Sequence, residues 1–559
     1  MKKIKYVAVV LMTIISLACN ENKWLEESVL DFYSPENTYS SPEQFNSAVA
    51  NEYNRIRTYY VAGHDAFYNL GGTLTDVFHN IYVAPNNNSN WQLIIPENSG
   101  YFWQQFYNTI FNMNVVIGRI DNENIKFKTE TEHNTLKAEA MFLRAFAYRG
   151  LGILYGGVPI ILEEVTAPKR DFVRASREEV FAQVISDLQF AISNLPEVTE
   201  LKEDGRLTKA AANHLLAEVY IIIKDWDKAI SAASAVISNP NYALMTNRFG
   251  SWKNKPGDVF RDLFIRNNQN RNCAGGPNTE AIWVSQYEYN VSGGGLEYDG
   301  PRYFGCWYHG LSGKDGKALF FGHSSQNGGR AIGFCATTDY ANYTIWENDP
   351  GDMRNSEYNI VRDMVCDNPK SAYYGQKIVE SNAILTPGNQ EEFWHPFWAK
   401  VTPFNNFPVE TIKDPATGAT YNSALGAFTD QYIFRLAETY LLRAEAYIGK
   451  GDKVSAAADI NVVRARANAP LVSSDDVDIE YLLDERAREL CIEEQRTMTL
   501  MRMGSAILVN HVRTYNPFYN GKFSNLEVIE DYNQLWPIPQ SEIERNTEAT
   551  LEQNPGYAN

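Results

Sequence analysis

The sequence predicts a mainly α-helical protein: a tetratricopeptide-like scaffold of helix pairs, interrupted by a long irregular segment with short strands. Two observations predict this fold. A short pattern of leucine, small residues and an aromatic residue recurs three times along the chain. Helical periodicity of the apolar residues is present on both sides of residues 249–429 and stops within them.

The recurring pattern occupies residues 143–148, 215–220 and 442–447, with the sequences LRAFAY, LLAEVY and LRAEAY. In the second and third copies an Asp and an Ala follow the Tyr at the same offsets; these are Asp225 and Ala229, then Asp452 and Ala456. Small side chains let two antiparallel helices approach closely, and the Tyr fills the space beside them. The irregular spacing of the copies indicates degenerate, interrupted repeats.

Helical spacing of apolar and small residues predicts helices over Thr135–Leu154, Thr208–Ile223 and Tyr432–Ile448. A further helix is predicted over Ile479–Met503. It carries many Arg and Glu residues, which we interpret as ion pairs on an exposed or interhelical face. We expect nearly all residues of these helices to pack in the core or to face solvent.

Residues 249–429 are rich in Gly, Asn, Pro and aromatic residues, with glycine clusters such as the one at 292–295. A short β-like run, Ala281–Ser285, interrupts the loops. The segment has too many aromatic residues and too little clustered charge for disorder, so we expect it to carry function. We call it the excursion.

The N-terminus is typical of a secretory signal peptide. Three lysines within the first five residues precede an apolar run of twelve residues, Tyr6–Leu17. A helix that spans a bilayer needs about 20 residues, so this run is too short to be a membrane anchor. The run leads into Ser16-Leu17-Ala18-Cys19, which resembles a bacterial lipobox. We therefore predict cleavage before Cys19 and lipidation of Cys19, because several acyl chains anchor a protein stably.

Composition excludes some partners and sites. The net charge is −18, and it becomes −21 once the three lysines are removed, which disfavours nucleic acid and anionic lipid headgroups. The turn Asn348–Asp352 could hold a structural Ca²⁺, but it lacks the spacing of an EF-hand. The histidines lack the spacing of zinc ligands. We therefore expect no cofactor. Beside Cys19, five cysteines allow at most two disulfides; they are Cys273, Cys306, Cys335, Cys366 and Cys491.

Several segments in a fixed order carry a family resemblance. They are AEAMFLRAFAY at 138–148 with LYGGVP at 154–159, RASREEVF at 174–181, GRLTKAAA at 205–212, ERAREL at 485–490 with EEQR at 493–496, WPIPQSEI at 536–543 and QNPGY at 553–557. With these segments the chain resembles, over nearly its whole length, the SusD/RagB family of outer-membrane nutrient-binding lipoproteins. One departure is RTMTLMRMG at 496–504, where relatives often have an Asp or a Trp.

The resemblance implies a scaffold of helical repeat pairs with the irregular segment laid across one side. It also implies a cell-surface location on the outer membrane, a SusC-like TonB-dependent transporter as partner, and an oligosaccharide, or sometimes a peptide, as cargo. The resulting division is a signal peptide at 1–18, a lipidated tether at 19–40, helical parts at 41–248 and 430–511, the ligand-binding excursion at 249–429, and a tail at 512–559.

Sugar rings present apolar C–H faces, which aromatic rings bind, and a rim of hydroxyl groups, which planar polar side chains bind. The resemblance places such residues before the first helix pair and in the excursion. We expect aromatic residues to form stacking platforms and Asp76 and Asn80 to bind hydroxyl groups; Trp283 lies in an apolar run that favours burial. The candidates are Asp76, Asn80, Trp91, Trp283, Tyr287, Tyr289, Trp307 and Tyr308.

Three other functions are alternatives. A surface glycosidase needs two carboxylates across a cleft, which a sequence of 68 acidic residues does not exclude, but HExxH, GxSxG, Walker and GxGxxG motifs are absent. We therefore predict that the chain is not an enzyme. A peptide-binding RagB-like member of the family would use pockets and exposed backbone instead of flat rings. A protein-binding scaffold is the third alternative, because helical repeats often bind proteins.

Overall fold

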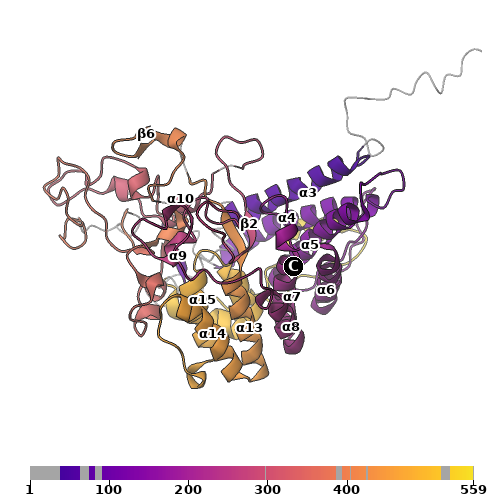
Figure 1. Cartoon of the computed structure of the whole chain (residues 1–559). Coiled ribbons are helices and arrows are strands. Elements are labelled where there is room, and N and C mark those ends of the chain that lie inside the picture. Colours follow the sequence, from indigo (N-terminus) through magenta and orange to yellow (C-terminus); the bar gives the residue numbers. More distant parts are fainter. Residues whose placement is uncertain are drawn as a thin grey trace, which may run out of the picture.

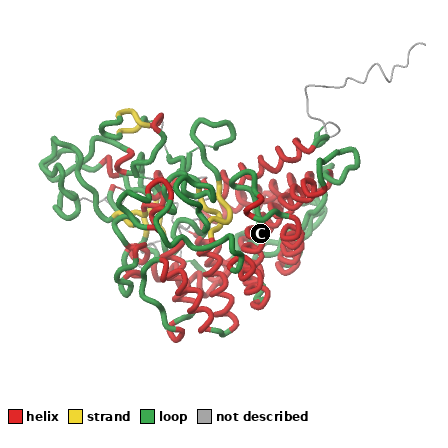
Figure 2. The backbone as a smooth tube through the Cα atoms, viewed as in Figure 1, coloured by secondary structure: helices red, strands yellow, loops and turns green. Residues whose placement is uncertain are grey.

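The computed structural model describes residues 38–62, 75–81, 91–295, 297–384, 393–402, 404–422, 426–517 and 529–557. The predicted signal peptide and Cys19 lie outside these ranges. The described chain is mainly helical, as predicted, and its strands form four two-stranded sheets. Helices gather on one side of the molecule and loops on the other (Figures 1 and 2). None of the described helices is both long enough and apolar enough to cross a bilayer.

The N-terminal helical part packs consecutive helices against one another, with α5 between α4 and α6. Close approach depends on glycines of α5. A Cβ on Gly150 would lie 2.5 Å from the ring of Phe106, and one on Gly152 would lie 2.9 Å from the ring of Phe181. The elements of this part are α3 (Pro42–Ile56), the π-helix η1 (Arg57–Ala62), β1 (Phe78–Asn80), α4 (Trp91–Arg119), α5 (Glu130–Leu154), α6 (Arg177–Asn194), α7 (Lys209–Ile222) and α8 (Trp226–Ile237).

The C-terminal helical part continues the same packing. Its first helix, α13, lies against α8, so the hairpins α7–α8 and α13–α14 are side by side (Figure 1). The chain then turns back, and its tail covers the N-terminal helices. The elements are β8 (Gln431–Arg435), α13 (Leu436–Lys450), α14 (Lys453–Arg466), α15 (Ile479–Leu490), α16 (Arg496–Met503), α17 (Ser505–Tyr515) and α18 (Gln540–Arg545).

The structure explains the recurring Asp and Ala of the repeats. Asp225 is the N-cap of α8 and accepts a hydrogen bond from the Lys228 N–H, and Asp452 caps α14 in the same way. Such caps satisfy backbone donors that a helix leaves free at its start. Ala229 and Ala456 are fully buried where the paired helices meet. The predicted helix hairpins are therefore confirmed.

Two predicted helices have different boundaries in the structure. Residues 432–435, predicted as helix, belong to β8, which pairs in antiparallel fashion with β2 (Ala281–Ser285) before α13 begins. The single helix predicted over Ile479–Met503 is two helices, α15 and α16. The turn between them contains Ile492 with a φ of 78°, a left-handed conformation that β-branched residues rarely adopt.

The excursion contains short elements and its own hydrophobic cluster, separate from that of the helical parts. In Figure 1 it occupies the upper left of the molecule, around α10 and β6. β1 pairs with β3, β4 with β5 and β6 with β7, all antiparallel. Its elements are α9 (Val259–Asp262), β2, α10 (Gly300–Phe304), β3 (Cys335–Thr337), α11 (Asp339–Asn342), β4 (Ile360–Val361), β5 (Phe397–Trp398), β6 (Ile412–Asp414) and β7 (Ala419–Thr420).

A buried network of ion pairs joins the excursion to α15. Glu489 of α15 is fully buried and contacts three guanidinium groups, those of Arg354, Arg435 and Arg466. Glu485 on the same helix pairs with Arg354 and with further arginines. The charges predicted for an exposed or interhelical face therefore lie between elements, where each buried charge has partners of opposite sign.

Candidate ligand-binding site

Strongly exposed aromatic side chains concentrate in the excursion. Within the described ranges, all five that are between 41% and 60% exposed lie between residues 249 and 429, and none lies on the helical parts. They are Phe321, Tyr343, Tyr358, Tyr374 and Tyr421. Exposed rings mark an interaction surface, because their apolar faces gain most from being covered.

Trp307 is the sequence-predicted platform that the structure places best. Its indole is half-buried and stacks on the ring of Phe393, with ring centroids 5.2 Å apart and planes 14° from parallel. Gly310 packs against this pair, and a Cβ at Gly310 would lie 2.8 Å from Phe393 and 3.2 Å from the indole nitrogen of Trp307. A side chain at position 310 would therefore push the two rings out of their stacked arrangement.

His309 holds the edge of the Trp307 indole. The Trp307 Nε1–H donates to His309 Nδ1 at 3.1 Å, and His309 Nε2 donates to the carbonyl oxygen of Ala331 at 2.9 Å. Because a carbonyl oxygen only accepts, the proton of His309 is on Nε2 and the imidazole is neutral. Burial, together with the nearby His323 and Arg330, lowers the pKa of His309 to about 4. The platform is therefore held by a neutral histidine at physiological pH.

We expect Trp307 to be released from His309 in acid. A proton on Nδ1 of His309 would place its N–H donor against the indole N–H donor of Trp307. The lowered pKa of His309 puts this protonation near pH 4. The stability that neutral His309 contributes is complete above about pH 6.5 and is lost as pH falls from there through about 4. The indole N–H resonance of Trp307, assigned with Trp307→Phe, is expected to stay constant from pH 7 to 5 and to shift below. A His309→Asn variant whose resonance is unchanged at pH 7 would contradict this.

Tyr289 is the second predicted platform that stays accessible. It is half-buried on the loop that follows β2, with its ring edge-on to Phe428 at 4.9 Å. Arg57 holds this loop by donating to the carbonyl oxygens of Gln286 and Gly293. Asp430 accepts the backbone N–H of Tyr287 at 2.7 Å, and burial raises the pKa of its carboxyl group to about 7.

Residues on either side of 423–425 lie near each platform. Asn422 accepts from or donates to His323, whose ring is 5.5 Å from that of His309, and Phe428 contacts Tyr289. Phe428 is six positions after Asn422, so their Cα atoms are at most about 21 Å apart. The contacts of the Trp307 and Tyr289 platforms with the chain around residues 422 and 428 are therefore close in sequence.

Four other candidates are buried and do not offer a surface to a ligand. Trp283 is 1% exposed, and its ring contacts those of Phe142, Phe146 and Phe434 in the main core. Tyr308 is fully buried and donates to the carbonyl oxygen of Gly329 at 2.7 Å. These two residues are reassigned from ligand contacts to the core.

Asp76 and Tyr287 are corrected for similar reasons. Asp76 is fully buried and pairs with both Arg496 and His511, so its oxygens already have donors. These partners hold the pKa of Asp76 well below its usual range in spite of burial, which alone would raise it. Tyr287 is 3% exposed, and the Arg57 guanidinium lies 5.6 Å from its ring centroid.

Two predicted site residues have side chains that the structure does not describe, and two residues of the platform were not predicted. Asn80 lies in β1 and Trp91 begins α4, but their side chains fall outside what the structure describes. Two residues of the platform were not predicted from the sequence: Phe393, which follows Trp307 by 86 positions, and His309, which is only two positions away. The closeness of His309 to the predicted platform Trp307 in the sequence could have indicated its role. No pattern in the sequence connects Phe393 with Trp307.

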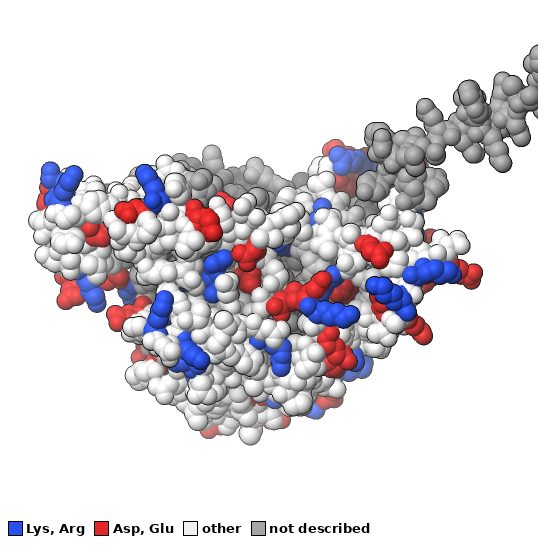
Figure 3. Space-filling view, turned by 45° about the horizontal axis from the view of Figure 1, so that its top comes forward, with Lys and Arg blue, Asp and Glu red and all other residues white. Residues whose placement is uncertain are grey.

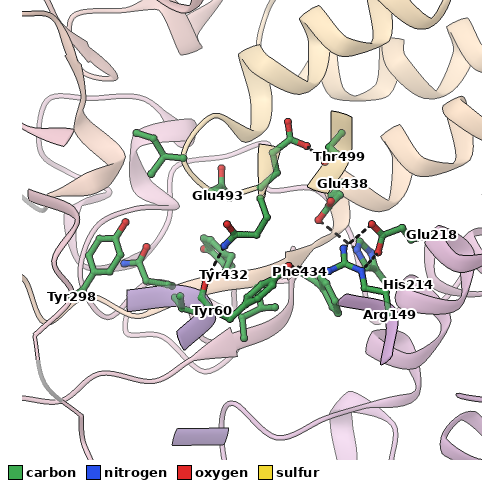
Figure 4. Close-up of a pocket in the computed structure, with 16 residues that line it drawn as sticks. Tyr60, Arg149, His214, Glu218, Tyr298, Tyr432, Phe434, Glu438, Glu493 and Thr499 are labelled. Atoms are coloured by element: carbon green, nitrogen blue, oxygen red, sulfur yellow. Dashed lines mark hydrogen bonds and ion pairs between the residues drawn. The ribbon is translucent and has the colours of Figure 1, made fainter. Parts of the chain in front are cut away.

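A small enclosed pocket lies between the two helical parts (Figure 4). In its wall Arg149 forms an ion pair with Glu218, and His214 Nε2 lies 3.4 Å from a carboxylate oxygen of Glu438. Its volume of about 40 Å³ suits water molecules, each of which occupies about 30 Å³ in the liquid, and is far too small for a sugar ring. This pocket is therefore not a candidate sugar site.

The cysteines and the candidate Ca²⁺ turn have structural surroundings. The five described cysteines are free thiols, four of them buried, and burial raises the pKa of Cys306 to about 12. In the turn, Asp349 pairs with Arg464 and Arg488, and Asp352 pairs with Arg354. Arginines therefore occupy the carboxylates that the Ca²⁺ hypothesis required. Among described residues no group of three or more His, Cys, Asp or Glu is arranged for a metal.

Charged side chains are mixed on the face that Figure 3 shows, where Lys and Arg alternate with Asp and Glu. A nucleic-acid-binding surface needs a continuous basic patch to neutralise phosphates. This face instead combines scattered charges with broad uncharged areas, which suits a neutral ligand.

Comparison with known proteins confirms the family resemblance. A model described as the SusD family matches residues 279–557, and one described as starch-binding associating with outer membrane matches residues 23–221. SusD-like protein P25 of Formosa agariphila is 25% identical over 580 residues, covering 97% of each chain. The starch-binding protein SusD of Bacteroides thetaiotaomicron is 36% identical over 143 residues, which are 26% of this chain and 23% of that protein.

Solved structures show the same fold. A laminarin binding SusD-like protein superposes with a TM-score of 0.68 at 22% identity, covering 93% of this chain and 100% of that one. A SusD homologue from Bacteroides thetaiotaomicron superposes equally well, with a TM-score of 0.68 at 19% identity, covering 93% and 98%. With two family models that together match both helical parts and most of the excursion, this chain belongs to the SusD family.

Proposed function

We propose that this protein is a cell-surface lipoprotein that binds an oligosaccharide without cleaving it and passes it to a SusC-like TonB-dependent transporter. One observation carries the proposal: Trp307 and Phe393 form a stacked, half-buried platform, held by His309, in the segment where the strongly exposed aromatic residues gather. Pre-ordered rings bind sugar faces at low entropic cost.

The relatives support the same class of ligand. One structural neighbour is named for laminarin binding, and a relative in sequence is named for starch binding. The outer-membrane location follows from the family, whose second matching model is described as associating with the outer membrane. Lipidation of Cys19 and delivery to the transporter are parts of the proposal that the N-terminal sequence and the family resemblance support.

Calorimetric titration with Trp307→Ala tests the site. A panel of α-glucan, β-glucan, xylan and mannan hexasaccharides identifies the ligand of the wild-type protein. We expect Trp307→Ala to weaken its binding at least about tenfold, or about 1.4 kcal/mol, because the stacking face is lost while the fold is retained. Trp252→Ala is the matched control, since Trp252 is also half-buried in the excursion but contacts Lys255.

Unchanged affinity of Trp307→Ala, with wild-type affinity in the control, would remove Trp307 from the site. Binding of extended peptides in place of every glycan would favour the RagB-like alternative. New reducing ends in the titrated sample would instead show an enzyme.

A further inference from the structure

A groove lies on the helical part, away from the Trp307 platform. It has a volume of about 650 Å³, within the range of small-molecule sites. One wall is the face of α4, and the other is formed by α18 and the loop that ends near Phe172. In Figure 1 α4 lies on the right, whereas the excursion is at the upper left.

The floor of this groove is a row of three aromatic side chains on α4. Trp103, Tyr107 and Phe111 follow one another at intervals of four residues, so each lies about 6 Å further along the helix. Their ring centroids are 4.9 Å and 6.0 Å apart. Tyr107 is fixed by donating to the carbonyl oxygen of Pro159 at 2.7 Å. Trp103 and Tyr107 are each 5% exposed and Phe111 is half-buried, so a ligand in the groove would contact mainly Phe111 and the small exposed parts of the other two rings.

Polar groups beside this row have no partners within the described chain. Trp103 is 5% exposed and lines the groove, yet its indole N–H makes no hydrogen bond there. The side-chain amide of Asn108 also lacks a partner among the described residues. By contrast, the indole N–H of Trp307 is occupied by His309. Neither the Trp103 indole N–H nor the Asn108 amide is among the buried side-chain atoms of the described chain that lack a partner, so both reach the groove, where the hydroxyl group of a ligand would replace water as their partner.

The opposite wall is held in place by Asn546. Its side chain accepts the backbone N–H of Phe172 and donates to the carbonyl oxygens of Phe172 and Ala549, all within 2.8–2.9 Å. Charges at the rim are paired, since Arg545 contacts Glu542 and Lys169 lies near Asp171. Walls of fixed shape, aromatic rings, free neutral donors and balanced charge suit a neutral ligand rich in hydroxyl groups.

We infer that this groove is a second oligosaccharide site, which binds the same class of cargo as the Trp307 platform. The inference rests on the proposed function for the class of ligand, but it rests on different residues. Two sites on different parts of one chain would let the protein hold a long glycan at two points, which raises the apparent affinity for long chains over short ones.

The test is the binding stoichiometry of four proteins with the same hexasaccharide panel: wild type, Trp307→Ala, the groove variant Asn108→Ala/Phe111→Ala, and their combination. We expect two molecules per wild-type chain, one per chain in each of the two partial variants, and none in the combination. Asn213→Ala, on the half-buried face of α7 outside the groove, is the control and is expected to bind two.

One molecule per wild-type chain that is lost only in Trp307→Ala would overturn the inference and leave the proposed function standing. Binding to neither site by any probe would overturn both. Because the groove variant could unfold, the indole N–H resonance of Trp103 in the wild-type protein is a second readout. It is expected to shift on addition of the hexasaccharide, and a resonance that does not move while glycan binds would also overturn the inference.

Discussion

Replacing Glu489 by glutamine is expected to lower the free energy of unfolding by about 3–5 kcal/mol, because it removes the central negative charge of a buried network. Glu489 contacts Arg354 at 2.9 Å, Arg435 at 2.5 Å and Arg466, and all four side chains are buried. Without this negative charge, the three buried guanidinium groups keep only part of the opposite charge that stabilises them, and water cannot reach them to replace it. Chemical denaturation followed by circular dichroism measures the loss.

Exposed Glu380 provides the matched control, and Glu380→Gln is expected to change stability by less than about 0.5 kcal/mol. A Glu489→Gln protein as stable as this control would show that the network does not stabilise the fold.

Acid should weaken the same network in the wild-type protein. Burial alone would raise the pKa of Glu489, but Arg466, Arg435 and Arg354 hold it well below its usual range, and arginines lower the pKa of Glu485 to about 2. These folded-state values lie below the unfolded ones, so their contribution is complete above about pH 4.5 and is lost as pH falls towards 2. The stability of Glu489→Gln should therefore depend less steeply on pH in this window.

Replacing Trp283 by alanine is expected to destabilise the protein by about 3–5 kcal/mol, the range for removing a large aromatic side chain from a packed core. Trp283 lies on β2, and its ring contacts Phe142 and Phe146 of α5 and Phe434 of β8, so it joins the N-terminal helices to the C-terminal part. The cavity left by alanine would be bordered by these rings, which are themselves fixed.

Comparison with Trp307→Ala makes this prediction specific. Because Trp307 is only half-buried, replacing it by alanine should lower the free energy of unfolding much less than Trp283→Ala does, but should remove most of the glycan affinity. The reassignment of Trp283 to the core would be wrong if Trp283→Ala kept its thermal midpoint and lost glycan binding.

The sequence predicted the repeats well, because their signals are local. Asp225 and Asp452 cap helices within three residues of their own position, and Ala229 and Ala456 lie one turn further on. The boundary at residues 431–435 could not be predicted in this way, because the partner of β8 is β2, about 150 residues earlier.

The candidate site was predicted only in part, because the sequence does not show which aromatic residues are exposed. Trp283 and Trp307 are the same residue type in one segment, yet one is in the core and the other lies at the surface. Asp76 was misassigned because its partner Arg496 lies 420 positions away, and only the folded chain brings the two charges together. Predicting the platform requires both the residue type and the exposure of its side chain, and only the folded chain shows the exposure.

The central claim is that this protein holds a glycan without changing it. The most direct measurement is equilibrium dialysis of the purified mature protein against a labelled glycan, followed by mass spectrometry of the glycan recovered from both chambers. We predict that the protein concentrates the glycan on its own side and that every recovered molecule keeps its original mass. Equal concentrations on both sides for every glycan tested, or recovered fragments of lower mass, would contradict the claim.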